Sequence, residues 1–244
     1  MLRVFLPIRC LNCDTHIDRT SSNSFEKYLC INCLRRFQQF ESPERDEFVD
    51  KESRFESLKS KYTLFAGYIF SSGDSLLQKL IHHSKYNSMR KLATLLGIET
   101  ASRLPTDLKA IDHIIPVPLH RARYSERGYN QSECIANGLA TVLQTTSVST
   151  KQLTRIKPTP SQTGLNAEER EENVKGAFKL NKSAVELKGK RLLLIDDVMT
   201  TGATLASAAL QLDKAGPLSI TIVAVSAVIN SDSLPTSAGA TAAK

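Results

Sequence analysis

The sequence contains no tryptophan, and aromatic residues make up only 6% of its 244 positions. A broad surface of rings for stacking against nucleotide bases is therefore not evident. No apolar run approaches the roughly 20 residues that span a bilayer, so we expect no transmembrane segment. The first residues, MLRVFLPIRC, lack a basic stretch followed by an apolar one, which argues against export. We therefore expect a cytoplasmic protein whose cysteines stay reduced.

Positive charge is concentrated in the middle of the chain. Residues 61–191 contain 20 Lys and Arg against 11 Asp and Glu, whereas residues 1–60 contain 10 of each. Such an excess attracts polyanions, either metabolites with a pyrophosphate group or nucleic acid. A scattered excess that only aids solubility is the alternative.

Composition divides the chain into four segments. Residues 1–40 form a cysteine module, and residues 41–61 are charged and poor in aliphatic side chains, as in a linker or an exposed helix. Residues 62–230 have the pattern of a folded domain. The small, polar tail 231–244 is expected to be disordered.

The folded domain alternates strands with helices. The expected strands are residues 62–70, 112–117, 153–156, 176–180, 191–195 and 220–228. The expected helices are a segment after Asp74 and residues 89–104, 130–144 and 203–215. This alternation indicates an α/β fold with a parallel sheet flanked by helices.

Four cysteines form two C-x2-C pairs, Cys10 with Cys13 and Cys30 with Cys33, and sixteen residues separate the pairs. This spacing is typical of a zinc site, and four thiolates leave no open position on the metal, so the zinc would be structural. A disulfide or redox pair is the alternative, which a reducing compartment disfavours. His16 lies between the pairs and is either a ligand, a neighbour of the site or an exposed loop residue.

The stretch LLLIDDVMTTGATL, residues 192–205, combines a buried strand, two acids and a turn into a helix. We expect Asp196 and Asp197 to lie at the carboxyl end of the strand, where open α/β sheets bind ligands. The turn offers hydroxyls and a glycine, so its N–H groups can converge on a phosphate without the lysine of a Walker loop. The turn residues are Thr200, Thr201, Gly202, Ala203 and Thr204. A helix start with ordinary capping residues is the alternative.

The same stretch closely resembles the 5-phosphoribosyl-1-pyrophosphate (PRPP) loop of type I phosphoribosyltransferases. The resemblance implies that Asp196 and Asp197 hold the ribose hydroxyls and that residues 200–204 hold the 5-phosphate. PRPP would be bound together with Mg²⁺.

Two basic loops are expected to lie near this site. Residues 116–131 follow a strand and contain Arg121, Arg123 and Arg127, whose guanidinium groups suit a pyrophosphate or nucleic acid. A solvated basic loop is the alternative. Residues 155–173 are rich in Pro, Ser, Thr and Gly and form either a mobile lid or a plain surface excursion.

Four motifs occur in one order: the paired cysteines, VPLHRARYSERGYNQS, TPSQTGLNAEEREENVKGAF and LLLIDDVMTTGAT. Together they resemble the competence protein F family, in which a zinc finger is joined to a phosphoribosyltransferase-like domain. The resemblance implies zinc on the four cysteines and PRPP at the acids and turn residues named above. The sequence departs from the family pattern at Lys85-Tyr86-Asn87-Ser88-Met89, where relatives often have Gly-Asp shortly after the aromatic residue.

Two functions follow from this resemblance. In the first, the protein is a PRPP-binding module that handles incoming single-stranded DNA during natural transformation, in contact with other DNA-uptake proteins. In the second, it is an active Mg²⁺-dependent phosphoribosyltransferase with an unknown acceptor. Such catalysis needs mainly positioning and charge stabilisation, for which the sequence has the parts. No pocket for an accepting base is recognisable.

Overall fold

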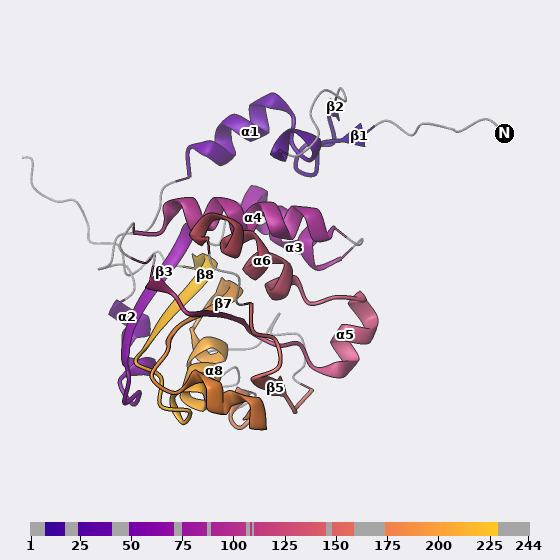
Figure 1. Ribbon diagram of the computed structural model, residues 1–244. Coiled ribbons are helices and arrows are strands. Elements are labelled where there is room, and N and C mark those ends of the chain that lie inside the picture. The colour runs from indigo at the N-terminus through magenta and orange to yellow at the C-terminus, as the bar shows by residue number, and fades with distance from the viewer. Residues whose placement is uncertain are drawn as a thin grey trace, which may run out of the picture.

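The computed structural model describes residues 8–17, 24–40, 49–70, 75–86, 89–105, 108, 110–144, 148–158 and 174–228. Its centre is a sheet of four parallel strands in the order β3-β8-β7-β4 (Figure 1). The strands are β3 (Lys61–Phe70), β4 (His113–Pro116), β7 (Arg191–Met199) and β8 (Ser219–Val228). The mixed α/β architecture with a parallel sheet confirms the fold class expected from the sequence.

Both faces of the sheet are buried, which explains why its strands are apolar throughout. Side chains alternate along a strand, so Leu192 and Leu194 of β7 belong to one core and Leu193 and Ile195 to the other. All four are fully buried. Strands covered on both faces require such unbroken apolar runs, and this is the pattern that the sequence analysis used to place β7.

Helices cover one face in two layers. Helices α3 (Ser75–Lys85), α4 (Arg90–Arg103) and α6 (Gln131–Leu143) lie above the sheet in Figure 1. Helices α4 and α6 approach so closely that a Cβ on Gly138 would lie 2.1 Å from the carbonyl oxygen of Thr94. Glycine is therefore required at that crossing, because any larger residue would push the helices apart.

The opposite face is covered by α8 (Ala203–Asp213), with α2 (Val49–Glu52) and the short 3-10 segments η3 (Ser53–Phe55) and η5 (Lys182–Leu187). The composition of residues 41–61 predicts a linker or an exposed helix. In the described part of that segment, however, Phe55 is fully buried and packs into the same core as α8, and Lys51 is also buried. This segment therefore belongs to the folded body, because it fills the face of the sheet beside α8.

A small N-terminal module consists of β1 (Ile8–Arg9), β2 (His16–Ile17), η1 (Phe25–Lys27) and α1 (Ile31–Gln38), on the outer side of α3 and α4 (Figure 1). Aromatic rings hold it in place. The ring of Phe37 lies 5.2 Å from that of Tyr68 on β3, and the guanidinium of Arg103 lies 4.1 Å above the Tyr68 ring. Arg103 also donates to the carbonyl of Phe40 at 2.7 Å. The module is thus packed onto the domain.

Three further features of the structure differ from, or add to, what the sequence predicts. Strand β7 runs to Met199, so Asp196 and Asp197 lie inside it and do not follow its end. The two short strands β5 (Leu153–Arg155) and β6 (Phe178–Leu180) pair antiparallel with each other, outside the parallel sheet. The first basic loop contains a helix, α5 (Arg121–Arg127).

Two of the expected segments lie largely or wholly outside the described residues. These are residues 159–173 of the second basic loop and the tail 231–244. Within the described part of the chain, none of the helices has the length and apolar character needed to cross a membrane.

Candidate functional site

The four cysteines of the N-terminal module converge. Cys10 and Cys13 lie in the turn after β1, while Cys30 caps α1 and Cys33 lies in its first turn. Their sulfur atoms all lie within 4.8 Å of one another. A tetrahedral zinc with bonds of about 2.3 Å places its sulfur ligands about 3.8 Å apart. The cluster therefore fits a metal site of this kind.

The cysteines are free thiols in the structure. The sulfurs of Cys13 and Cys30 are 3.5 Å apart, far longer than the bond of about 2.0 Å in a disulfide. A hydrogen bond with the Thr15 hydroxyl lowers the pKa of Cys13 to about 6, and Asn12 donates to the sulfur of Cys33 at 3.2 Å. Each contact favours the thiolate form that metals bind, although burial outweighs the Asn12 contact and raises the pKa of Cys33 to about 12. His16 is exposed on β2 and is not a member of the cluster.

A second candidate site is centred on Asp196 and Asp197. Both residues are buried, and we call them the acid pair. Asp196 is 8% exposed and Asp197 is 6% exposed. The carboxylate of Asp196 accepts from the Ser132 hydroxyl at 2.9 Å and from the backbone N–H of Asp197 at 2.9 Å. Burial and the neighbouring charge of Asp197 raise the pKa of Asp196 to about 7. Asp196 can therefore either accept or donate a hydrogen bond near neutral pH.

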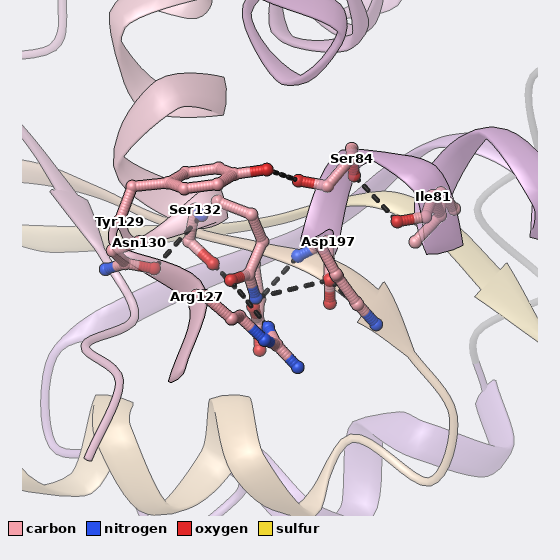
Figure 2. A network of polar contacts seen from close by, with 10 residues as sticks. Ile81, Ser84, Arg127, Tyr129, Asn130, Ser132 and Asp197 are labelled. Carbon is pink, nitrogen blue, oxygen red and sulfur yellow. Dashed lines mark hydrogen bonds and ion pairs between the residues drawn. The ribbon is translucent and has the colours of Figure 1, made fainter. Parts of the chain in front are cut away.

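Asp197 has charged and polar partners from two helices (Figure 2). The ammonium of Lys85, at the end of α3, lies 2.9 Å from its carboxylate. The side chain of Gln131, at the start of α6, donates to the same oxygen at 3.3 Å. The side-chain amide oxygen of Gln131 accepts from the guanidinium of Arg127 at 2.8 Å, which connects α5 to the acid pair.

Tyr129 connects the two segments that contact the acid pair. Its buried hydroxyl donates to the backbone carbonyl of Ser84 at 2.5 Å, directly before Lys85 (Figure 2). The next residue along, Asn130, caps α6 by accepting from the N–H of Ser132 at 3.1 Å and is fixed by its own donation to the carbonyl of Val117. The Tyr129 hydroxyl therefore links the segment before α6 to the end of α3, the two segments whose side chains contact the acid pair.

The turn after β7 has the conformation that its glycine suggested. Gly202 has φ of 79° and precedes the first residue of α8. The hydroxyl of Thr201 accepts from the N–H of Ala203 at 3.4 Å, a local hydrogen bond between residues two apart, while Gly202 itself is the N-cap of α8. A Cβ on Gly202 would lie 3.7 Å from the side chain of Arg54, so a basic residue of η3 lies beside this turn. Arg54 was not expected there, because its segment resembled a linker.

Further arginines approach the acid pair from α5 and β5. Arg155 of β5 is largely buried, which lowers its pKa, while the charge of Asp196 raises it. The charges of Arg123 and Arg127 also act on Arg155, so the three guanidinium groups share one region. Together with Lys85, these arginines outnumber the two carboxylates of the acid pair. Arg121 of the predicted set is exposed on α5.

Several of these residues could not be identified from the sequence. Gln131 and Ser132 are buried polar residues at a helix start, where hydrophilic side chains are ordinary capping residues. Their only signal was the polar string Asn130-Gln131-Ser132 at the beginning of an otherwise apolar helix. Tyr129 gave no signal, because a tyrosine next to a basic loop has no preferred role.

Comparison with known proteins identifies the class of domain that contains the acid pair. Residues 130–238 match the family model "Phosphoribosyl transferase domain", a range that contains α6, β7, α8 and β8. The chain thus carries a domain of the phosphoribosyltransferase class.

Individual relatives identify the family. The chain is 30% identical over 223 residues to competence protein F of Haemophilus influenzae, which covers 87% of this chain and 93% of that protein. It is 32% identical over 151 residues to DNA utilization protein YhgH of Escherichia coli K12, covering 60% of this chain and 65% of that protein. This chain therefore belongs to the competence protein F family, as its motifs indicated.

Among solved structures, AQ2163 protein from Aquifex aeolicus aligns with a TM-score of 0.36 and 16% identity. That alignment covers 65% of this chain and 86% of the other. The score is too low to support any inference about function.

Proposed function

We propose that this protein binds PRPP at the acid pair and handles incoming single-stranded DNA during DNA uptake in the cytoplasm. The observation that supports PRPP most strongly is the juxtaposition of Asp196 and Asp197 with the left-handed Gly202 turn, inside a matched phosphoribosyl transferase domain. The names of the relatives, competence protein F and DNA utilization protein, support the second half of the proposal.

The parts of PRPP suit different parts of the site. Residues 200–204 offer hydroxyls and the N-terminus of α8 to the 5-phosphate, because helix starts attract anions. The acid pair suits the ribose hydroxyls, and the raised pKa of Asp196 lets it exchange donor and acceptor roles. Lys85, Arg127 and Arg155 suit the pyrophosphate, whose charge they would offset.

Mg²⁺ fits the same site, since carboxylate and phosphate oxygens are the ligands that it prefers. When bound with PRPP, it would offset the charge of the pyrophosphate. On the chain's side, Asp197 is the carboxylate whose present cationic partner is Lys85.

The N-terminal metal is proposed to be zinc, held by Cys10, Cys13, Cys30 and Cys33. Four protein ligands leave no position for a substrate, so this metal would stabilise the module of residues 1–40. The contact of the Phe37 ring with the Tyr68 ring supports a module that packs against residues 62–230, which we propose as the phosphoribosyltransferase-like domain.

The second candidate is an active transferase that moves phosphoribose from PRPP to an acceptor. The basic groups around the acid pair favour it, because they would stabilise a leaving pyrophosphate. The residues would act by orienting PRPP and holding its charges, with no covalent step on the protein.

Two measurements test the proposal. Fluorescence anisotropy of a labelled 20-mer of single-stranded DNA should show binding that weakens steeply with salt, since each neutralised phosphate releases counterions. Pyrophosphate release from PRPP and Mg²⁺, tried with each nucleobase, separates the candidates: no release with PRPP bound supports the binding module, and release with one base establishes the transferase. Absence of DNA binding at low salt would overturn the DNA-handling half.

A further inference from the structure

Helix α5 lies at the edge of the molecule, apart from the sheet and from α8 (Figure 1). It has seven residues, and none of them is buried. Both ends are fixed locally: the ring of His120 accepts from the N–H of Ala122 at 3.3 Å, and Gly128 ends the helix with φ of 75°. Arg90 of α4 also donates to the carbonyl of Gly128 at 2.8 Å. The helix is therefore a defined surface element.

One face of α5 belongs to the phosphoribosyl site. Arg123 and Arg127 are four residues apart, which places them on the same side of a helix. Arg127 donates to Gln131, and its guanidinium lies 5.2 Å from the centre of the Tyr86 ring. Its Nε is buried without a hydrogen-bond partner among the described residues. Arg123 is half-buried and pairs with Glu126 at 3.4 Å.

The outward face of α5 carries an exposed guanidinium beside an exposed ring. Arg121 and Tyr124 are three residues apart and are therefore adjacent on the helix, and both are exposed. Arg127 is also three residues from Tyr124 but is half-buried, so exposure, and not spacing, separates the two faces. Tyr124 is 50% exposed, more than any other tyrosine or phenylalanine whose side chain the structure describes. The single acid of the helix, Glu126, is in the ion pair with Arg123 and does not neutralise Arg121.

We propose that α5 divides its residues between two ligands: Arg123 and Arg127 face the phosphoribosyl site, while Arg121 and Tyr124 form a contact for single-stranded DNA. This inference rests on the proposed DNA-handling function. It adds the surface, and it separates three arginines that the sequence alone leaves as one group.

Charge and ring chemistry favour a single strand as the occupant. A guanidinium binds a backbone phosphate, and an exposed ring can stack on any unpaired base. Stacked bases of duplex DNA do not offer their faces to such a ring. An acidic protein segment would pair with the charge of Arg121 but would make little use of the Tyr124 ring. The exposed ring therefore favours single-stranded DNA over an acidic protein segment.

The test uses the full-length protein with four variants. Tyr124→Ala should weaken binding of a single-stranded 20-mer by about 5-fold to 100-fold, as loss of one stacked base does. Arg121→Ala should weaken it and reduce the slope of log affinity against log salt by about 0.7. Both should leave PRPP affinity within about twofold. Arg127→Ala should weaken PRPP binding and leave DNA affinity within about twofold. Lys214→Ala removes an exposed charge at the end of α8 and is the control, which should change neither affinity.

Each contrary result has a distinct meaning. If the wild type binds DNA but Tyr124→Ala and Arg121→Ala bind it equally well, the assignment to α5 is wrong and the proposed function stands. If the wild type binds no DNA, the proposed function itself fails. If Tyr124→Ala weakens duplex binding equally, or if polyglutamate competes with DNA as well as unlabelled DNA does, the occupant is not a single strand.

Discussion

The ammonium of Lys85 lies 2.9 Å from the carboxylate of Asp197, and this ion pair joins the end of α3 to the C-terminal part of β7. The lysine side chain is 25% exposed and that of the aspartate 8%. A ligand that uses Asp197 must therefore share or displace Lys85. Helix α3 also contacts the N-terminal module, because Lys79 donates to the Asn12 carbonyl at 2.7 Å. One helix therefore joins the cysteine cluster to the acid pair.

Removing the lysine should destabilise the fold. Lys85→Met leaves the buried Asp197 without its cation, so we expect the free energy of unfolding to fall by about 1–3 kcal/mol. Urea denaturation at pH 7.5 measures the change. The double variant Lys85→Met/Asp197→Asn should recover much of the loss, because no buried charge is left unpaired. Equal stability of Lys85→Met and the wild type would show that the pair has no structural role.

Tyr129→Phe tests the link between α3 and α6. The variant leaves the buried Ser84 carbonyl without its donor and should lower the free energy of unfolding by about 1 kcal/mol. It should also weaken PRPP binding, because Lys85 and Gln131 lose their common support. The matched control is Tyr124→Phe, whose exposed hydroxyl should affect neither quantity. PRPP affinity equal to that of the wild type would restrict Tyr129 to packing.

The pKa of Asp196 predicts a dependence of stability on pH. Burial raises the native pKa to about 7 from the ordinary carboxyl value of 3.8, so between these values the folded protein holds a proton that the unfolded chain has released. Between these two values, the contribution of Asp196 to stability falls as pH rises, by at most about 1.4 kcal/mol per pH unit. The stability of the wild type relative to Asp196→Asn should therefore be greater at pH 5 than at pH 8.

Asp112 provides a contrast of opposite sign. Hydrogen bonds from Arg191 lower the pKa of Asp112, so its contribution is present above its unfolded pKa and is lost as the solution is acidified through the folded value. Urea denaturation of the wild type, Asp196→Asn and Asp112→Asn over a range of pH measures both trends. A difference between the wild type and Asp196→Asn that stays constant from pH 5 to pH 8 would contradict the raised pKa.

The metal site predicts one Zn²⁺ per purified chain. Cys30→Ser should lose the metal and disorder roughly the first 40 residues, since metal binding and folding are coupled in small zinc modules. Metal analysis and near-ultraviolet circular dichroism follow the two effects. Cys134→Ser is the matched control, because this cysteine lies on α6 outside the cluster. Substoichiometric zinc in carefully reduced protein would count against the site.

The parts of the fold that depend on local pattern were predictable. The apolar run before Asp196 predicts a buried strand, and Gly202 allows the left-handed turn that the structure contains. The end of β7 was misplaced because two acids normally stop a strand. Here they are accommodated by Ser132 and Lys85, which lie 64 and 112 residues away in the chain, and no local pattern shows such partners.

Long-range packing explains the other differences. Phe55 is buried because it packs into the same core as the apolar residues of α8 and the sheet. Its neighbours in the sequence are charged, so the sequence does not indicate this burial. The strands β5 and β6 were predicted as strands, but their antiparallel pairing depends on two segments brought together across the chain. The division of α5 into two faces required knowing where Gln131 and Tyr86 lie.

Calorimetric titration of PRPP with Mg²⁺ tests the central claim most directly. The wild type should bind one PRPP per chain, and Asp196→Ala and Asp197→Ala should each weaken binding by about tenfold or more, because a site built to hydrogen-bond hydroxyls loses its partners. Gly189→Ala, at another left-handed glycine that precedes the start of β7, at the opposite end of that strand from the acid pair, is the control for a general loss of folding. No binding by the wild type, or unchanged affinity in both aspartate variants, would contradict the account.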